Sequence, residues 1–259
     1  MLLTIDVGNT QTVIGLYGDG DASHELLDHW RIATVGDRTC DEHALLFQEF
    51  LAFAGHDWRT DIRGVAISSG VPMVTYELRR MCERYLKIDP VVLGTGVKTG
   101  MPVLYDNPKE VGADRIANAV GAFDLYGGPT IVVDFGTATT FDVISDSGEY
   151  LGGAIIPGIE ISLDALFGRA AALRRVELVE PRSVIGKTTV ESIQSGVIYG
   201  YSSMIDGMCD RIEEELGAAT VLATGGLADL IAPVAESIEH TEPWLTLHGL
   251  RLIWEKNAA

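Results

Sequence analysis

The order of apolar and polar residues predicts strands and helices in both halves of the chain. Apolar runs at 2–5 and 13–17 flank a turn-forming stretch, which is typical of a β-hairpin. Thr39 or Asp37 can cap a helix whose spaced apolar positions continue to Gly55. The same criteria predict strands at 64–69, 91–94, 130–136, 139–145, 149–155 and 220–223, and helices at 74–86, 108–126, 160–172, 188–215, 227–237 and 246–257.

The first hairpin recurs in the second half of the chain. The stretch 5–12 (IDVGNTQT) resembles 133–140 (VDFGTATT), and apolar runs surround both copies. The identical pairs lie 128 positions apart, and they are Asp6 with Asp134, Gly8 with Gly136, and Thr12 with Thr140. This offset is close to half of the 259 residues, so the pattern indicates duplication of a whole domain. Two unrelated Asp-x-Gly turns are the alternative.

Hairpins followed by alternating helices and strands predict an α/β fold with mixed sheets. Turn-forming residues at 127–129 place a domain boundary within 115–129. We expect an N-terminal domain at 1–117 and a C-terminal domain at 118–259. Because no low-complexity linker separates them, the halves are expected to pack closely.

Composition narrows the classes of function. The formal charge is −18 and the isoelectric point is near 4.6, which disfavours binding to nucleic acid or to an anionic membrane surface. No apolar run approaches the length of a membrane span, and the start of the sequence does not resemble a signal peptide. Three widely spaced cysteines fit reduced thiols better than a disulfide framework. We therefore expect a cytoplasmic protein.

The Asp-x-Gly hairpins have the chemistry of a phosphate site. Glycine lets backbone N–H groups approach an oxyanion, and threonine hydroxyls add donors. An aspartate repels phosphate, so its natural role is to hold a cation or the cation's water beside the phosphate. A third stretch at 223–228 (ATGGLA) lies between a predicted strand and a helix, and its glycines could lie against an adenosine. Two facing hairpins of this kind would bind one nucleotide from both sides.

The motifs DVGNT, DFGTATT and ATGGLA, in this order, resemble those of the actin/Hsp70/sugar-kinase superfamily. DNPKEVGADR at 106–115, YLGGA at 150–154 and GKTT at 186–189 make the whole chain similar to the type III pantothenate kinases. The resemblance implies two duplicated ribonuclease-H-like (actin-like ATPase) domains. It also implies ATP-dependent phosphorylation of (R)-pantothenate to (R)-4′-phosphopantothenate, the first step of coenzyme A biosynthesis. ATP, Mg²⁺ and a monovalent cation, K⁺ or NH₄⁺, would be required, and the enzyme would be a homodimer with its sites at the interface.

The resemblance also carries roles onto individual residues. Asp114 corresponds to the catalytic proton acceptor, and Asp134 to the ligand of the monovalent cation. Asp6 is assigned to the divalent metal through the phosphates. The matching ATP-binding positions are Asp6, Val7, Gly8, Asn9, Thr10, Gln11, Thr12, Val13 and Thr137. The matching pantothenate-binding positions are Tyr105, Gly112, Ala113, Asp114, Arg115 and Thr189. Whether Arg115 contacts the carboxylate of pantothenate or the transferring phosphoryl group stays open.

The residues around Asp114 allow two interpretations without the resemblance. Asn107, Pro108 and Glu110 form a helix start, and an apolar stripe follows. Asp114 points away from that stripe, on a face that carries the small residues Ala117, Asn118 and Gly121. Small residues suggest that something approaches this face closely, whereas an exposed carboxylate without a function is the alternative.

Two other functions compete with pantothenate phosphorylation at this point. One is a different small-alcohol or sugar kinase that shares the hairpins. The other is a non-catalytic nucleotide-binding accessory or regulatory protein. The three aspartates of the motifs favour an enzyme.

Overall fold

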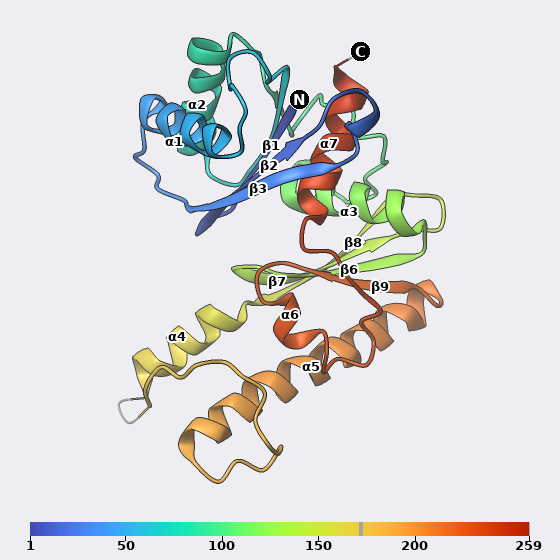
Figure 1. Cartoon of the computed structure of the whole chain (residues 1–259). Helices are drawn as coiled ribbons and strands as arrows, with labels where there is room; N and C mark the ends of the chain where they lie inside the picture. The colour runs from blue at the N-terminus through green and yellow to red at the C-terminus, as the bar shows by residue number, and fades with distance from the viewer. Residues whose placement is uncertain (171–172, 259) are drawn as a thin grey trace. The chain divides into compact units, whose positions relative to one another are not determined.

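The computed structural model describes residues 1–170 and 173–258, and these form two compact units. The first unit comprises Met1–Gly121 together with Leu245–Ala259, and the second comprises Ala122–Trp244. Each unit is built on one five-stranded sheet (Figure 1). The predicted α/β class with mixed sheets is therefore confirmed.

The first sheet has the order β3-β2-β1-β4-β5. Its strands are β1 (Leu2–Val7), β2 (Gln11–Tyr17), β3 (Leu26–Ala33), β4 (Gly64–Ser69) and β5 (Val91–Val92). β1 pairs antiparallel with β2 and parallel with β4, so the sheet is mixed. Helices α1 (Cys40–Phe53) and α2 (Pro72–Met81) share a hydrophobic core with the strands on one face. Thr39, one of the two caps that the sequence predicts, is the N-cap of α1, and it forms a capping box with Glu42.

The second sheet repeats this topology with the order β10-β9-β6-β7-β8. Its strands are β6 (Thr130–Phe135), β7 (Ala138–Ile144), β8 (Tyr150–Pro157), β9 (Thr220–Thr224) and β10 (His240–Thr241). β6 pairs antiparallel with β7 and parallel with β9, as β1 pairs with β2 and β4. Helices α4 (Ile159–Arg169), α5 (Thr189–Leu216) and α6 (Ala228–Ile231) supply the core on one face. The repeated topology confirms the duplication.

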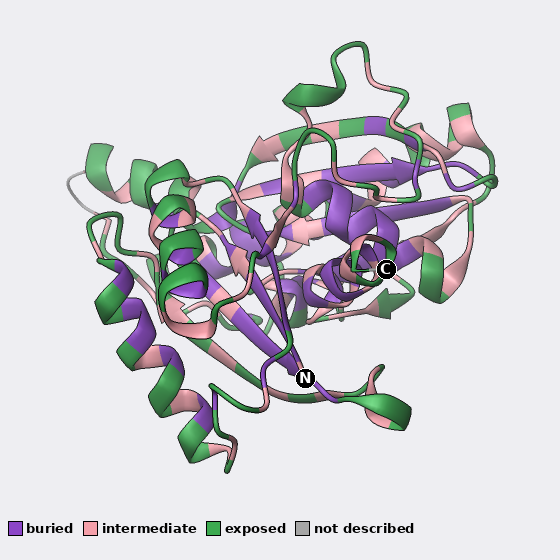
Figure 2. Cartoon of the chain, turned by 90° about the horizontal axis from the view of Figure 1, so that it is seen from above, coloured by how far each residue is buried: buried purple, intermediate pink, exposed green. Residues whose placement is uncertain are grey.

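The central strands are the most buried part of each sheet (Figure 2). In both β1 and β6 the pattern of burial is continuous until the aspartate near the strand end, which is half-buried. Asp6 alternates with Ile5 and Val7, whose side chains belong to the core shared with α1 and α2. Asp134 alternates in the same way with Val133 and Phe135. Both aspartates therefore point away from the main core of their own unit.

The two hairpins differ in the length of their loops. In the first, the last strand pair is Val7 with Thr12, which leaves residues 8–11 as the loop. In the second it is Phe135 with Thr139, which leaves 136–138. The structural counterpart of Thr12 is therefore Thr139, and not Thr140 as the constant offset predicts. The second loop is one residue shorter, and a sequence comparison without a gap hides that difference.

The C-terminal helix α7 (Leu245–Asn257) belongs to the first unit, although the sequence analysis assigns it to the C-terminal domain. It packs on β1, β4 and β2, so the red end of the chain returns to the blue strands in Figure 1. Its backbone also lies against helix α3 (Ala113–Tyr126), because a methyl group on Gly249 would overlap the carbonyl oxygen of Ala117. Thr246 Oγ1 donates a hydrogen bond to Asn118 Oδ1 at 2.7 Å.

The small residues on α3 therefore have a structural explanation. Ala117 and Asn118 are fully buried, and a methyl group on Gly121 would lie 2.9 Å from the carbonyl oxygen of Leu245. The sequence analysis infers from these small residues that something lies close to this face of α3, and in the structure that neighbour is α7. The small residues are consequently not evidence for a ligand beside Asp114.

Several element boundaries differ from the prediction. The helix predicted at 108–126 is a 3-10 turn, Pro108–Glu110, followed by α3, and the helix predicted at 74–86 is α2 with a π turn at Cys82–Leu86. The helix predicted at 227–237 is reduced to α6, and the strand at 91–94 to β5. The end of the helix predicted at 160–172 lies outside the described residues. β3 is absent from the prediction because its residues alternate between exposed and half-buried, so it has no buried apolar signal.

Among the described helices, none is both long enough and apolar enough to span a bilayer.

Candidate functional site

The first hairpin loop is held by hydrogen bonds from β2 and from the segment that follows β3. Gly8 N–H donates to the carbonyl oxygen of Gln11 at 3.0 Å and closes the loop. Thr34 Oγ1 donates to the carbonyl oxygen of Gly8 at 2.8 Å, and Thr34 N–H donates to the carbonyl oxygen of Thr10 at 2.9 Å. Thr12 Oγ1 lies 2.9 Å from Thr34 Oγ1. The buried Thr12 thus joins a hydroxyl pair that fixes the loop from behind.

The predicted ATP-binding residues in this loop are accessible. Asn9, Thr10 and Gln11 are exposed, and Val13 is half-buried. Arg31 on β3 donates to Gln11 Oε1 at 2.9 Å, which gives the loop a fixed guanidinium at its edge. The loop therefore presents backbone and hydroxyl donors outward while its rear is anchored.

Asp6 lies directly opposite Ser68 in the parallel pairing of β1 with β4. Ser68 is fully buried, and its hydroxyl has no hydrogen-bond partner. A buried hydroxyl without a partner is costly, and it is commonly satisfied by a water molecule or a ligand. Asp6 and Ser68 thus bring two oxygen-bearing side chains to paired positions near the ends of β1 and β4. Oxygen donors of this kind suit Mg²⁺, which usually binds to one or two carboxylates together with substrate phosphates.

The second hairpin loop is held by close backbone packing. Gly136 N–H donates to the carbonyl oxygen of Ala138 at 3.1 Å, and Thr137 is exposed at the middle of the loop. Behind the loop lies Gly158, where a methyl group would overlap the carbonyl oxygen of Thr137 and lie 2.8 Å from that of Gly136. Only a residue without a side chain fits there.

Asp134 and the Gly225-Gly226 turn are brought together by the pairing of β6 with β9. Asp134 lies opposite Thr224, and the next residue, Gly225, has φ +93°. A methyl group on Gly225 would lie 2.5 Å from Asp134 Oδ1 and 2.7 Å from the backbone of Phe135. A left-handed glycine in contact with the aspartate therefore joins two of the predicted motifs into one surface.

Asp114 lies on the first turn of α3 and lines a cavity of about 660 Å³ within the first unit. The cavity walls are Ser69 and Gly70 at the end of β4, the loop around Thr95 and Thr99, and the segment 107–114. Gly70 N–H donates to the carbonyl oxygen of Val7 at 3.2 Å, so this wall is continuous with the end of β1. The volume is within the range of small-molecule sites.

The Asp114 side chain is exposed, and its Oδ1 accepts a hydrogen bond from the backbone N–H of Arg115 at 2.9 Å. Gly112 leaves room for the carboxylate, because a methyl group there would overlap Asp114 Oδ1. Ala113 lines the cavity beside Asp114, whereas Arg115 is buried and Tyr105 is half-buried in the preceding loop. The structure thus places Gly112, Ala113 and Asp114 at one cavity.

Thr189 is the first residue of α5 and is exposed. The cap of this helix is Thr188, whose side chain accepts a hydrogen bond from the Glu191 N–H. Thr189 lines a mainly apolar cavity of about 440 Å³ with Leu163 and Tyr201, inside the second unit. Thr189 is not among the residues that line the cavity containing Asp114.

Thr34 and Gly158 support the loops but are absent from the sequence-predicted site. Thr34 follows β3, which itself lacks a clear sequence pattern, so nothing connects it with the first loop. Gly158 directly follows Pro157, the last residue of β8, and a Pro-Gly pair indicates only a turn. Their roles come from pairings between distant segments, and these pairings are not visible in the local sequence.

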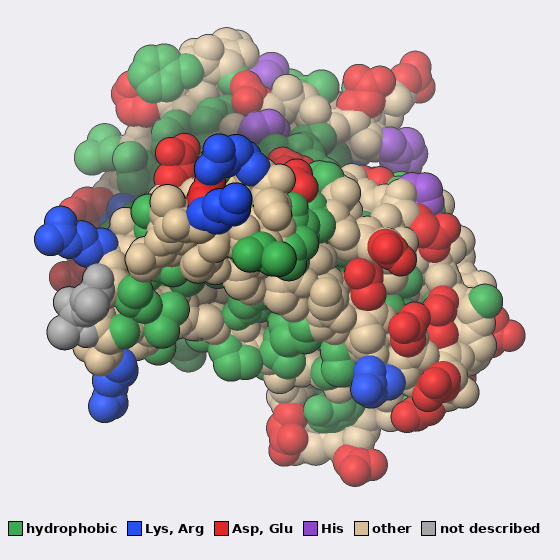
Figure 3. All heavy atoms as spheres, turned by 90° about the horizontal axis from the view of Figure 1, so that it is seen from below, with side chains coloured by type: hydrophobic (Ala, Val, Ile, Leu, Met, Phe, Trp, Pro, Cys, Tyr) green, Lys and Arg blue, Asp and Glu red, His purple; other side chains and the backbone are tan. Residues whose placement is uncertain are grey.

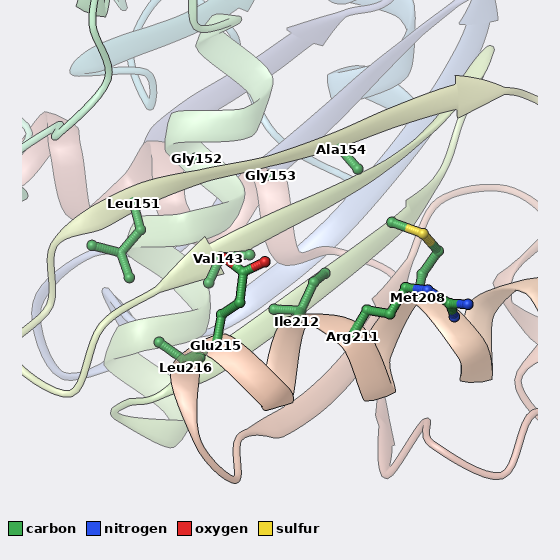
Figure 4. Close-up of a pocket in the computed structure, with 10 residues that line it drawn as sticks. All are labelled: Val143, Leu151, Gly152, Gly153, Ala154, Met208, Arg211, Ile212, Glu215 and Leu216. Atoms are coloured by element: carbon green, nitrogen blue, oxygen red, sulfur yellow. The ribbon is translucent and has the colours of Figure 1, made fainter.

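A further cavity of about 520 Å³ lies between β8 and α5 (Figure 4). Gly152 and Gly153 form its strand wall, and Met208, Arg211 and Glu215 project from the helix. None of the sequence-predicted site residues lines it. Among the described residues, no group of three or more His, Cys, Asp or Glu side chains is placed to hold a metal ion.

Comparison with known proteins supplies the family. The family model for type III pantothenate kinase matches residues 2–211. A type III pantothenate kinase of Streptomyces griseus is 55% identical over 267 aligned positions, which cover 100% of this chain and 99% of that protein. One of Moorella thermoacetica is 52% identical and covers 99% of this chain and 100% of its own.

Solved structures show the fold at much lower identity. A putative Baf family transcriptional activator from Campylobacter jejuni has a TM-score of 0.62 at 20% identity, with 99% of this chain and 98% of that chain covered. A putative 2-dehydro-3-deoxygalactonokinase from Sinorhizobium meliloti has a TM-score of 0.59 at 13% identity, covering 100% and 96%. The duplicated sheets are therefore those of the actin-like and sugar-kinase fold. On its sequence identity over the full length, the chain belongs to the type III pantothenate kinase family.

Proposed function

We propose that this protein phosphorylates the primary 4′-hydroxyl of (R)-pantothenate with ATP and releases 4′-phosphopantothenate and ADP. The observation that carries the proposal is the full-length identity of more than half with type III pantothenate kinases. The reaction is the entry step of coenzyme A biosynthesis. ATP as a co-substrate fits the expected cytoplasmic location.

Asp114 is the proposed general base. A primary alcohol is a poor nucleophile, and a carboxylate within hydrogen-bond reach can take its proton as the bond to phosphorus forms. Asp114 is exposed at a cavity of ligand size, which supports this role. Its hydrogen bond from the Arg115 N–H fixes one carboxylate oxygen at the start of α3. The other oxygen is then available to accept the proton.

The two hairpins are the proposed phosphate-binding loops. The exposed residues at 9–11 and Thr137 would donate to the phosphates of ATP. Asp6 would hold Mg²⁺ or its water beside them, and the unpartnered Ser68 hydroxyl supports an oxygen-bonded occupant at this position. Mg²⁺ would supply charge neutralisation on the nucleotide phosphates. Asp134, in contact with Gly225, would hold the monovalent cation, K⁺ or NH₄⁺.

The direct test is a coupled assay of ADP release with purified protein, ATP, Mg²⁺, K⁺ and pantothenate. We expect turnover that depends on pantothenate and yields the 4′-phosphate by mass spectrometry. No ADP release from a folded sample would refute the proposal. A wider set of small alcohols and sugars in the same assay separates pantothenate phosphorylation from that of a related kinase.

Asp114→Asn tests the general base. The variant should lower kcat by roughly 10²–10⁴ and leave the unfolding temperature nearly unchanged, because the side chain is exposed. Asp89→Asn is the matched control, since Asp89 is also exposed in the first unit but lies outside the cavity. Equal turnover of Asp114→Asn and the wild type would remove Asp114 from this role.

The cation and the homodimer have separate tests. Replacing K⁺ by Na⁺ should depress turnover in the wild type, and Asp134→Asn should abolish the difference between the two cations.

Light scattering should give twice the mass of the 27.9 kDa chain. A monomer with full activity would contradict the proposed sites at a subunit interface.

A further inference from the structure

The cavity that contains Asp114 has one positively charged side chain among its described lining residues. The ionisable side chains on its wall are Lys109, Glu110 and Asp114. Glu110 is already engaged, because Asn107 Nδ2 donates to its Oε1 at 2.7 Å. Lys109 forms no ion pair with any described residue. Its charge is therefore available to a molecule in the cavity.

The backbone of Lys109 is held in place although its side chain is exposed. It lies in the 3-10 turn Pro108–Glu110, where Pro108 restricts the backbone. Asn107 Oδ1 accepts from the Lys109 N–H at 3.4 Å, and the Glu110 N–H donates to the Asn107 carbonyl oxygen at 3.0 Å. The flexible stem of the lysine thus starts from a fixed point on the cavity wall.

The charge of the whole protein makes a local cation necessary for an anionic substrate. The formal charge is −18, and on the face drawn in Figure 3 acidic side chains are spread widely while Lys and Arg form a few small groups. Two of the three ionisable groups on the cavity wall are acids. An anion entering this cavity is repelled by both the field of the protein and the wall, unless one cation compensates.

A hydroxy acid presents two chemically different ends to such a wall. Its hydroxyl needs a base, which Asp114 supplies, and its carboxylate needs a cation, which Lys109 supplies. A charge-assisted hydrogen bond from an ammonium to a carboxylate is about twice as strong as a neutral one. A neutral alcohol of the same shape would gain nothing from the lysine.

We propose that Lys109 is a specificity-determining residue that binds the carboxylate of the substrate in this cavity. It therefore selects a hydroxy acid over a neutral alcohol. This inference rests on the proposed function, because it takes pantothenate as the hydroxy acid. Lys109 acts on binding and has no part in proton transfer.

The experiment compares Lys109→Gln, Lys109→Arg and the matched control Lys98→Gln. Lys98 is an exposed lysine on the loop that forms another part of the wall, but it is not among the lining residues. The readouts are KM and kcat for pantothenate, and the calorimetric affinities for pantothenate and for pantothenol, in which CH₂OH replaces the carboxylate. Circular dichroism and thermal unfolding verify that each variant is folded.

Lys109→Gln should raise the KM and Kd for pantothenate roughly tenfold or more, with kcat changed less than twofold, and should leave pantothenol binding unaffected. Lys109→Arg should recover most of the affinity, and Lys98→Gln should behave as the wild type. High salt should weaken pantothenate binding to the wild type more than to Lys109→Gln.

Three results would overturn the assignment: an unchanged pantothenate affinity in Lys109→Gln, an equal loss in Lys98→Gln, or a loss confined to kcat. Failure of the proposed function is distinguishable from these results. It would appear as an absence of turnover in the wild type, whereas the calorimetric difference between wild type and Lys109→Gln would still test the lysine.

Discussion

The two hairpin loops have the same fold and the same aspartate, yet they are supported in different ways. Hydrogen bonds from Thr34 hold the first loop: its hydroxyl donates to the carbonyl oxygen of Gly8, and its backbone N–H donates to that of Thr10. Backbone packed against Gly158 and Gly225 holds the second loop, with no room for a side chain. A duplicated sheet therefore preserves the position of the aspartate without preserving how its loop is fixed.

The difference predicts unequal sensitivity to mutation. A hydrogen bond can lengthen by a few tenths of an ångström at modest cost, and its net contribution is about 1 kcal/mol. Overlap with a backbone atom cannot be relieved without moving a strand, and it costs about 1–3 kcal/mol or more. The second loop should consequently tolerate less change than the first.

Gly158→Ala should have the largest effect on this comparison. The added methyl group overlaps the Thr137 carbonyl oxygen, so we expect a loss of about 3 kcal/mol in unfolding free energy and a weaker affinity for ATP. Gly168→Ala in α4 is the control, because a methyl group there meets no atom within 4 Å and should be neutral or stabilising. Urea titration measures both. Equal stability of the two variants would contradict a tightly packed second loop.

Gly225→Ala separates backbone strain from contact with the aspartate. Gly225 and Gly217 have nearly the same φ, +93° and +91°, but only Gly225 has neighbours that a methyl group would reach. Gly217→Ala should lose about 1–2 kcal/mol from strain alone, and Gly225→Ala should lose at least 2 kcal/mol more. Only the Gly225 variant should also alter the response of turnover to K⁺. Identical losses would show that the contact contributes nothing.

Acidification should destabilise the first unit more than the second. Burial lowers the pKa of His43 from its usual 6.5 to about 4, with a smaller contribution from Arg38, and neither ring nitrogen has a hydrogen-bond partner. The unfolded chain therefore binds a proton at pH values where folded His43 does not. Stability should fall as the pH drops from 6.5 towards 4, by about 2 kcal/mol at pH 5.

Hydrogen exchange at pH 7 and pH 5 should detect this loss in the first unit. The second unit contains a single histidine, His240, which is exposed at the edge strand β10. His43→Leu should remove most of the pH dependence between these values. An undiminished acid sensitivity in that variant would assign the effect to other groups.

Thr34→Val should have the smallest effect. It removes the hydroxyl that donates to Gly8 and pairs with Thr12, so we expect a loss of about 1 kcal/mol and a rise of a few-fold in the KM for ATP. Thr34→Ser retains the hydroxyl and serves as the control. If Thr34→Val proved as damaging as Gly158→Ala, the two loops would be equally rigid and the contrast would fail.

The sequence predicts those features that depend on neighbouring residues. The N-cap at Thr39, the two hairpins and the duplicated order of elements follow from patterns along the sequence, and each is present in the structure. Asp114 could be singled out from the motif around it, and the structure adds the cavity that it lines.

The remaining features depend on contacts between distant segments. The constant offset of 128 positions pairs Thr12 with Thr140, whereas the strand register pairs it with Thr139, because the second loop is one residue shorter than the first. The small face of α3 suggested a ligand because nothing in the local pattern identifies α7 as its neighbour. Thr34 and Gly158 carry no motif at all, since each acts on a loop that is more than 20 positions away.

The packing of α7 on β1 and β4 has a consequence for how the protein folds as it leaves the ribosome. Residues 245–258 emerge after the whole second unit, so the sheet that bears Asp6 lacks this covering helix until the second unit has been synthesised. The unit whose synthesis begins first is thus the last to be completed, and nascent chains should expose its uncovered face to chaperones in the interval.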